Sequence, residues 1–91
     1  MHAVHVDLLR ERKALRPADS YSVELFDDRE RIQRKIMEEA FETCLEFGRT
    51  DRSHERIVSE AADLVFHLLV GLVDCEVSFD EVLDELARRR G

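Results

Sequence analysis

The chain has few residues that would interrupt or cross-link it. Its 91 residues include three glycines and one proline, which leaves few breaks between helices. The two cysteines, Cys44 and Cys75, lack any paired spacing such as C-x-x-C. We interpret both as small core residues of a protein in a reducing compartment.

Signals for secretion and for a membrane span are also missing. The first seven residues lack a basic segment followed by a long apolar stretch, so we expect no signal peptide. The most apolar run, residues 64–73, is interrupted by His67 and is too short to cross a bilayer. We expect one small domain over residues 1–91, which oligomerisation would help to stabilise.

The net charge restricts the class of partner. A formal charge of −7 argues against nucleic acid, because binding its phosphates requires basic patches. A small phosphorylated substrate remains open, since bridging metal ions can reverse the local electric field. The closing run Arg88-Arg89-Arg90 suits a helix C-terminus and is a poor candidate for a nucleic-acid patch.

Hydrophobic periodicity predicts an all-α fold with four helices and no strand. Ser20-Tyr21-Ser22 is expected to open a short helical turn that ends at Phe26. Asp27 is expected to cap the second helix, Gly48 to stop it, and Ser78 to form a capping box with Glu81. The expected helices cover residues 4–15, 27–47, 53–75, and a last segment that begins at Ser78.

Two acidic clusters carry most of the functional information. The first is Glu38-Glu39-Ala40-Phe41-Glu42 and the second is Glu60-Ala61-Ala62-Asp63. Acids three or four residues apart share one face of a helix. On the helix over residues 27–47, Lys35, Glu46 and the first cluster occupy one arc, opposite an apolar arc. Taken alone, that acidic arc could be an ordinary solvated face. The apolar arc comprises Ile32, Ile36, Met37, Ala40, Phe41, Cys44 and Leu45.

The helix over residues 53–75 is apolar around nearly its whole circumference, which is typical of a buried helix. Its polar residues fall in one narrow stripe, and buried carboxylates are costly unless a cation balances them. An antiparallel pairing with the preceding helix would bring the two acidic clusters together. Carboxylate ligands favour Mg²⁺ or Mn²⁺. The alternative is a set of salt bridges to basic residues. The stripe comprises Glu60, Asp63, His67 and Asp74, and the basic residues are Arg31, Arg34, Lys35 and Arg56.

Two further residues have two interpretations each. His67 lies one turn beyond Asp63, where a hydrogen-bonded supporting or core residue is favoured over a metal ligand. Lys35 is either an ion-pair partner of Glu39 or a residue that holds a substrate phosphate.

The pattern Glu39-x-x-Glu42, a spacer, then Glu60-x-x-Asp63 is similar to the all-α MazG-like nucleotide pyrophosphohydrolase superfamily. Residues 31–42, 59–69 and 77–83 narrow this likeness, because they resemble the phosphoribosyl-ATP pyrophosphatase family of histidine biosynthesis. The resemblance covers roughly residues 8–90.

The resemblance implies a Mg²⁺-dependent hydrolysis of phosphoribosyl-ATP between its α and β phosphates, in a cytoplasmic homodimer with helices packed across subunits. It implies a four-helix MazG-like bundle. The residues carried over by motif are Glu39, Glu42, Glu60 and Asp63 as metal ligands, Glu38 and Glu39 as catalytic residues, and Lys35, Ser20, Tyr21 and His67 on the substrate side.

Some positions depart from the family pattern. Met37 stands where the family often has glycine, and Glu24 stands where a lysine is common. These changes leave room for a house-cleaning pyrophosphohydrolase that acts on dUTP or dCTP. A third hypothesis is a non-catalytic dimeric helical module that keeps acidic patches.

Overall fold

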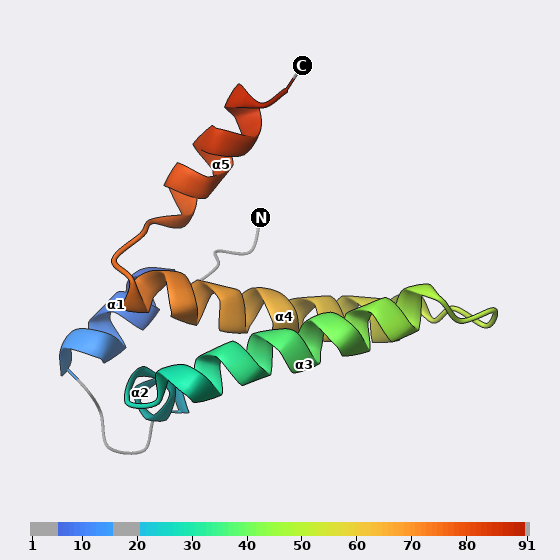
Figure 1. Cartoon of the computed structure of the whole chain (residues 1–91), viewed down its shortest axis with the longest axis horizontal. Helices are drawn as coiled ribbons and strands as arrows, with labels where there is room; N and C mark the ends of the chain where they lie inside the picture. The colour runs from blue at the N-terminus through green and yellow to red at the C-terminus, as the bar shows by residue number, and fades with distance from the viewer. Residues whose placement is uncertain (1–5, 16–20, 91) are drawn as a thin grey trace.

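The structure, a computed structural model, describes residues 6–15 and 21–90. Within these residues the protein is all-α, with five helices and no strand. The predicted short turn after Ser20 is a helix of its own, which raises the expected four helices to five. The helices are α1 (Val6–Leu15), α2 (Tyr21–Phe26), α3 (Arg29–Phe47), α4 (His54–Asp74) and α5 (Phe79–Arg88) (Figure 1).

The two long helices, α3 and α4, form an antiparallel pair joined by a short turn (Figure 1). Helices α1 and α2 pack against the end of this pair that is remote from the turn. Helix α5 projects away from the pair and has no buried residue. A closed four-helix bundle is therefore not confirmed for the single chain.

The helix ends follow capping chemistry. Ser53 and Ser78 cap α4 and α5, and Ser78 forms the predicted capping box with Glu81. The cap of α3 is Asp28, whose Oδ1 accepts a hydrogen bond from the Arg31 backbone N–H at 3.0 Å. The prediction of Asp27 was wrong by one residue, because the adjacent aspartate has the geometry to reach the third residue of the helix.

The apolar core lies where α1 and α2 meet the long pair. Lys13 fastens α1 to the end of α4, because its Nζ donates to the Asp74 carbonyl oxygen at 3.0 Å and lies 3.6 Å from the Asp74 carboxylate. Among the described residues, no helix covers the other half of the long pair. The buried apolar side chains are Leu9, Leu25, Phe26, Ile32, Leu69, Val70 and Val73.

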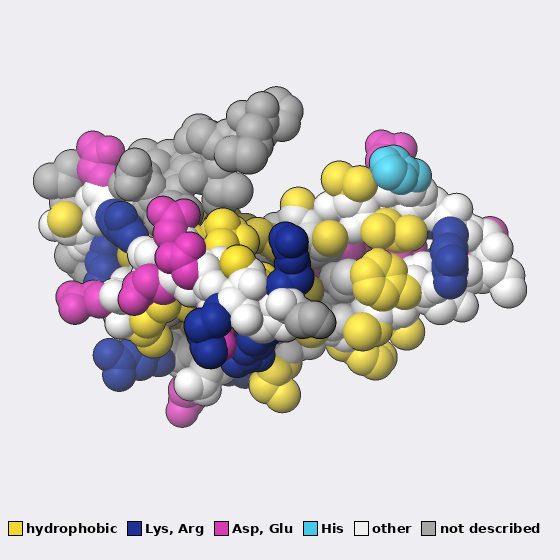
Figure 2. All heavy atoms as spheres, turned by 90° about the horizontal axis from the view of Figure 1, so that it is seen from above, with side chains coloured by type: hydrophobic (Ala, Val, Ile, Leu, Met, Phe, Trp, Pro, Cys, Tyr) yellow, Lys and Arg dark blue, Asp and Glu magenta, His cyan; other side chains and the backbone are white. Residues whose placement is uncertain are grey.

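The uncovered half of the pair presents apolar side chains to the outside. Met37 and Phe41 on α3 are 72% and 65% exposed, while the acidic Glu39 between them is only 7% exposed. The interpretation of the acids as a solvated face is therefore wrong for Glu39. Figure 2 shows hydrophobic side chains gathered over one part of the pair, with acidic atoms visible there mainly as a narrow strip.

Two other expectations are wrong. Helix α4 is not buried all round, because Val58, Val65 and Leu68 are at least 40% exposed on its uncovered side. Cys44 and Cys75 are free and exposed, so neither is a core residue within one chain. Cys44 belongs to the outward arc of α3, and Cys75 caps the end of α4.

The corner between α4 and α5 is a tight backbone turn. Glu76 adopts a left-handed conformation with φ of 60°. The Val77 N–H donates to the Leu72 carbonyl at 2.9 Å and the Glu76 N–H donates to the Val73 carbonyl at 3.0 Å. This pair of bonds is the Schellman motif, which ends a helix and usually places glycine at the left-handed position. The corner sets the direction in which α5 leaves the molecule.

Candidate metal and nucleotide site

Three carboxylates, one buried, one exposed and one half-buried, converge between the two long helices. Glu39, Glu42 and Glu60 each offer an oxygen, and these oxygens all lie within 4.8 Å of one another. Glu39 and Glu42 come from one face of α3, and Glu60 comes from α4. The antiparallel pairing that the spacing predicted thus brings the first acidic cluster opposite the second. We refer to these three residues as the carboxylate triple.

The carboxylate triple holds buried oxygens without hydrogen-bond donors. Oε2 of Glu39 and Oε2 of Glu60 are inaccessible to solvent and have no hydrogen-bond partner in the structure. A buried carboxylate oxygen without a partner is destabilising, because it has lost water and gained nothing in return. A hard divalent cation would supply the missing partner, and an all-oxygen donor set suits Mg²⁺ or Mn²⁺. The residues present therefore fit the predicted metal.

Repulsion within the triple is visible at Glu60. Burial raises the pKa of Glu60 above its ordinary value of 4.5, and hydrogen bonding to Glu42 raises it further. The charges of Glu42, Glu39 and Asp63 act in the same direction. A cation bound between these groups would reverse each of those electrostatic contributions.

Asp63, the fourth predicted ligand, does not belong to the triple. It stands one turn further along α4, is exposed, and acts on Glu60 through its charge. Because Asp63 is exposed and close enough for its charge to act on Glu60, it could coordinate a metal ion from the solvent-exposed side of the triple.

Lys35 and Glu38 lie beside the triple on α3. The Lys35 Nζ is 3.4 Å from Glu38 Oε2 and 3.6 Å from Glu39 Oε1. The hydrogen bond to Glu38 is the largest cause of a raised Lys35 pKa, with smaller contributions from Glu39 and Tyr21. Lys35 therefore does form the ion pair expected of a partner of Glu39, and its ammonium group also lies at the edge of the site.

The alternative of internal salt bridges is only partly realised. Within residues 21–90, Glu42 and Glu60 form no ion pair with any basic residue. Arg56 pairs instead with Glu46 at 3.7 Å, and Arg31 pairs with Glu24 at 3.8 Å. The charge of the triple is thus left largely uncompensated.

The predicted substrate-side residues divide into exposed and buried members. Tyr21 is 38% exposed and its Oη lies 3.0 Å from Nε2 of His67, which is 5% exposed. His67 is therefore shielded from solvent, and of these two side chains only Tyr21 reaches the surface. Ser20 falls outside the described residues. The sequence analysis considered Arg31 only as a salt-bridge partner of the acids and did not predict that its guanidinium lies 5.3 Å from the Tyr21 ring centroid. Its position one turn before Lys35 was the available signal.

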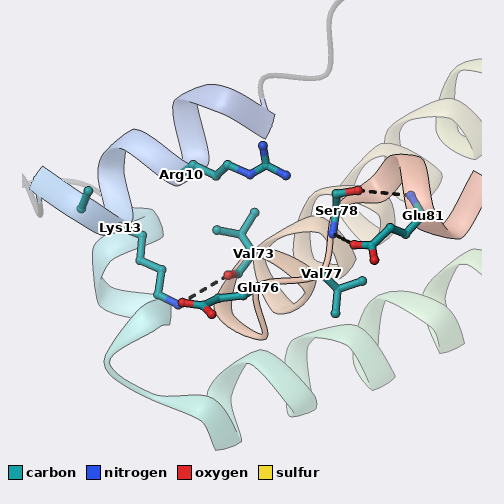
Figure 3. A pocket seen from close by; sticks show the side chains of 8 residues that line it. Arg10, Lys13, Val73, Glu76, Val77, Ser78 and Glu81 are labelled. Carbon is teal, nitrogen blue, oxygen red and sulfur yellow. Dashed lines mark hydrogen bonds between the residues drawn. The ribbon is translucent and has the colours of Figure 1, made fainter.

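A hollow of about 490 Å³ lies apart from these acids, between α1 and the corner that joins α4 to α5 (Figure 3). Arg10 and Lys13 approach it from α1, and Glu76, Ser78 and Glu81 approach it from the corner. None of the predicted site residues lines it.

No helix among the described residues has both the length and the apolar character that a bilayer span requires.

Comparisons with known proteins give a consistent result. The family model described as phosphoribosyl-ATP pyrophosphohydrolase matches residues 4–90. The chain is 42% identical over 85 residues to "Phosphoribosyl-ATP pyrophosphatase" of Zymomonas mobilis, covering 92% of this chain and 78% of that protein. It is 37% identical over 84 residues to the protein of the same name from Neisseria meningitidis serogroup C, covering 91% and 77%.

Longer relatives also match. The chain is 41% identical over 83 residues to "Histidine biosynthesis bifunctional protein HisIE" of Salmonella typhi. That alignment covers 90% of this chain and 40% of the relative, so the chain spans about two fifths of the bifunctional protein.

Proposed function

Because this chain belongs to the phosphoribosyl-ATP pyrophosphohydrolase family, we propose that it hydrolyses phosphoribosyl-ATP between the α and β phosphates. The products are phosphoribosyl-AMP and pyrophosphate, and the reaction is the second step of histidine biosynthesis. The observation that carries this proposal is the carboxylate triple, whose buried oxygens lack partners and whose donor chemistry suits a phosphate-bridging metal.

The proposed cofactor is Mg²⁺, with Mn²⁺ as a substitute. Glu39, Glu42 and Glu60 would hold it, and Asp63 would contribute from the open side of the site. When bound, such an ion neutralises charge on the phosphates and on the leaving pyrophosphate. A cation here would offset the mutual repulsion of these carboxylates, which the ion pair of Lys35 with Glu39 compensates only in part.

The other residues of the site have roles that follow from their positions. Glu38 is 57% exposed on its side chain and adjoins the triple, so it can accept a proton from a water molecule that attacks a phosphate. Lys35 can turn its ammonium group from Glu38 and Glu39 toward a phosphate oxygen, since ion pairs at an open edge are weak. Tyr21 reaches the surface beside them.

The test is pyrophosphate release from phosphoribosyl-ATP by the purified protein with Mg²⁺. Glu39→Gln and Asp63→Asn should each lower kcat/KM by about 100-fold or more without loss of helical signal. Changes outside the ligand shell of a metal already cost about 10–100-fold. Glu55→Gln, which changes an exposed acid on α4, is the matched control and should retain wild-type rates.

A panel of dUTP, dCTP and phosphoribosyl-ATP completes this test. Preference for a deoxynucleotide would show that the chain is a house-cleaning pyrophosphohydrolase. Absence of hydrolysis of all three, with no rise in Tm on adding Mg²⁺ and nucleotide, would show a non-catalytic helical module.

The assembly we propose is a cytoplasmic homodimer. The support is the uncovered apolar face of the long helix pair, which is too extensive for a monomer of this size to leave in water. A groove of about 460 Å³ that is lined by Ile36 and Gly71 meets this face at Leu68, and α5 carries an exposed apolar edge at Leu83 and Leu86. A second copy would cover both surfaces. The exposed apolar face comprises Met37, Phe41, Leu45, Val58, Val65 and Leu68.

A further inference from the structure

Tyr21 and His67 form a hydrogen-bonded pair that contacts Asp63, one turn along α4 from Glu60. They come from α2 and α4, 46 residues apart, and the Tyr21 Oη lies 3.0 Å from His67 Nε2. The other ring nitrogen, Nδ1, lies 2.8 Å from the backbone carbonyl oxygen of Asp63. His67 is 5% exposed and Tyr21 is 38% exposed, so only the phenol can meet a substrate.

The partners of the imidazole fix its tautomer. A carbonyl oxygen only accepts hydrogen bonds, so Nδ1 of His67 must carry the proton that binds Asp63. In the neutral ring the remaining nitrogen, Nε2, has a lone pair and no proton. With the imidazole neutral, the Tyr21 hydroxyl donates its single proton to Nε2.

This arrangement determines what Tyr21 offers to the site. A phenol that has donated its one proton presents only oxygen lone pairs to any further partner. A phosphate oxygen is also an acceptor and would gain no hydrogen bond from it. A hydroxyl or amino group would gain one.

Other contacts hold the Tyr21 ring in place. The Arg31 guanidinium lies 5.3 Å from the ring centroid, and Glu24 lies 3.8 Å from that guanidinium. The Phe66 ring is stacked with the Tyr21 ring at a centroid separation of 6.1 Å. Glu24 therefore forms an ion pair with Arg31, and the paired guanidinium packs against the Tyr21 ring.

We propose that His67 is a positioning residue that holds the Tyr21 hydroxyl as a hydrogen-bond acceptor, so that Tyr21 binds a hydroxyl or amino donor of the substrate nucleotide. The inference rests on the proposed function for the identity of that substrate. It divides the recognition of the nucleotide between two groups. Lys35 and the metal ligands meet its phosphates, and Tyr21 meets its sugar or base.

The first test is spectroscopic and needs no substrate. In a long-range ¹H–¹⁵N correlation spectrum at pH 8, His67 should show a protonated Nδ1 and a bare Nε2. Tyr21→Phe should shift the Nε2 signal, because that nitrogen loses its donor. A proton on Nε2, on either sample, would overturn the inference.

The second test uses a matched pair of substitutions. Asparagine can replace Nδ1 of histidine but cannot reach Tyr21, whereas glutamine can place a carbonyl oxygen near the position of Nε2. His67→Asn and Tyr21→Phe should each raise KM by about tenfold, the effect of one hydrogen bond, with kcat within about twofold. His67→Gln should stay within about threefold of wild type. The double variant Tyr21→Phe/His67→Asn should be no worse than either single variant.

A purely structural role for His67 predicts different results. His67→Asn and His67→Gln would then lower Tm together, and the double variant would show additive losses. Either outcome would overturn the inference. If the wild-type protein released no pyrophosphate, the proposed function would fail, while the spectroscopic result would still decide the state of the Tyr21–His67 pair.

Substrate analogues identify the donor. One analogue lacks a ribose hydroxyl and the other lacks the amino group of the base. The analogue that lacks the true donor should bind the wild-type protein about tenfold more weakly than the parent compound does. The Tyr21→Phe variant should bind this analogue and the parent compound with equal affinity. If neither analogue distinguishes wild type from Tyr21→Phe, then Tyr21 does not bind a donor and the inference is wrong.

Discussion

Glu60 on α4 lies against Glu42 on α3, within the group of oxygens that span less than 4.8 Å. Both side chains are acidic, and the contact is one of the places where the two long helices meet. Selection for stability alone would favour an apolar or oppositely charged pair here. The contact therefore has measurable consequences for the protein without metal.

The first prediction concerns the stability of the metal-free protein with pH. The pKa of Glu60 is raised in the folded state, first by burial and then by Glu42. A carboxyl group whose pKa is raised by folding binds its proton more tightly in the folded state, so it stabilises the fold below pH 4.5. That stabilisation is lost as the pH rises through the folded-state pKa. Glu60→Gln cannot ionise, so its Tm should exceed that of wild type at pH 7, and the two should converge below 4.5.

Adding Mg²⁺ should reverse this order. Wild type should gain Tm by binding the ion in its folded state only, whereas Glu60→Gln should gain little. Differential scanning fluorimetry with and without Mg²⁺ measures both effects. Equal Mg²⁺ responses in the two proteins would show that Glu60 is not a ligand.

The second prediction concerns Lys35. Lys35→Gln removes a cation that lies 3.6 Å from Glu39 Oε1, so the acidic cluster becomes more negative. Affinity for Mn²⁺ should stay equal or increase, as measured by calorimetric titration. The KM for phosphoribosyl-ATP should rise about tenfold, because a charged hydrogen bond to a phosphate is worth about 1.5 kcal/mol. An unchanged KM would leave Lys35 as an ion-pair partner alone.

The third prediction concerns the corner before α5. Glu76 has φ of 60°, a conformation that costs side-chain-bearing residues about 1 kcal/mol relative to glycine. Glu76→Gly should raise Tm by about 4–8 °C for a domain of this size. Glu76→Ala removes the same carboxylate but keeps Cβ, so it should give no such gain. Equal Tm values for the two variants would contradict the argument from backbone strain.

The fourth prediction concerns assembly. Phe41 is 65% exposed within one chain and lies between Met37 and Leu45 on the α3 side of the exposed apolar face. Phe41→Glu should weaken self-association by about 100-fold or more, because an unpaired charge would be buried. Sedimentation analysis should find a dimer for wild type and for the control Thr50→Glu, and a monomer for Phe41→Glu. A monomeric wild type at micromolar concentration would exclude the proposed dimer.

Helix ends were largely predictable because capping is local. Ser78 forms the expected capping box, and α3 ends at Gly48 as expected. Asp27 and Asp28 are chemically identical neighbours, and only the fold determines which of them reaches the Arg31 amide.

The directions of the helix faces were less predictable. A helical wheel groups residues into arcs but does not say which arc meets the rest of the chain. Met37 and Phe41 lie outside and Glu39 lies inside, the reverse of a simple amphipathic helix. The apolar side chains are arranged for a surface that one chain does not cover, so a pattern read within one chain misplaces them.

The candidate site shows the same division. Spacings of three and four residues were enough to place Glu39 and Glu42 on one face and to suggest their meeting with Glu60. The contact between Tyr21 and His67 spans 46 residues and depends on how α2 packs on α4. No periodicity in the sequence encodes such a contact.

The turn between α3 and α4 has a consequence for how this protein can be combined with others. Every carboxylate of the candidate metal site lies within residues 39–63, on two helices joined by that one turn. The proposed metal ligands therefore lie on a single helical hairpin. A catalytic domain joined at either end would leave the hairpin geometry untouched. The arrangement suits a portable unit, of the kind that longer bifunctional relatives contain as one part.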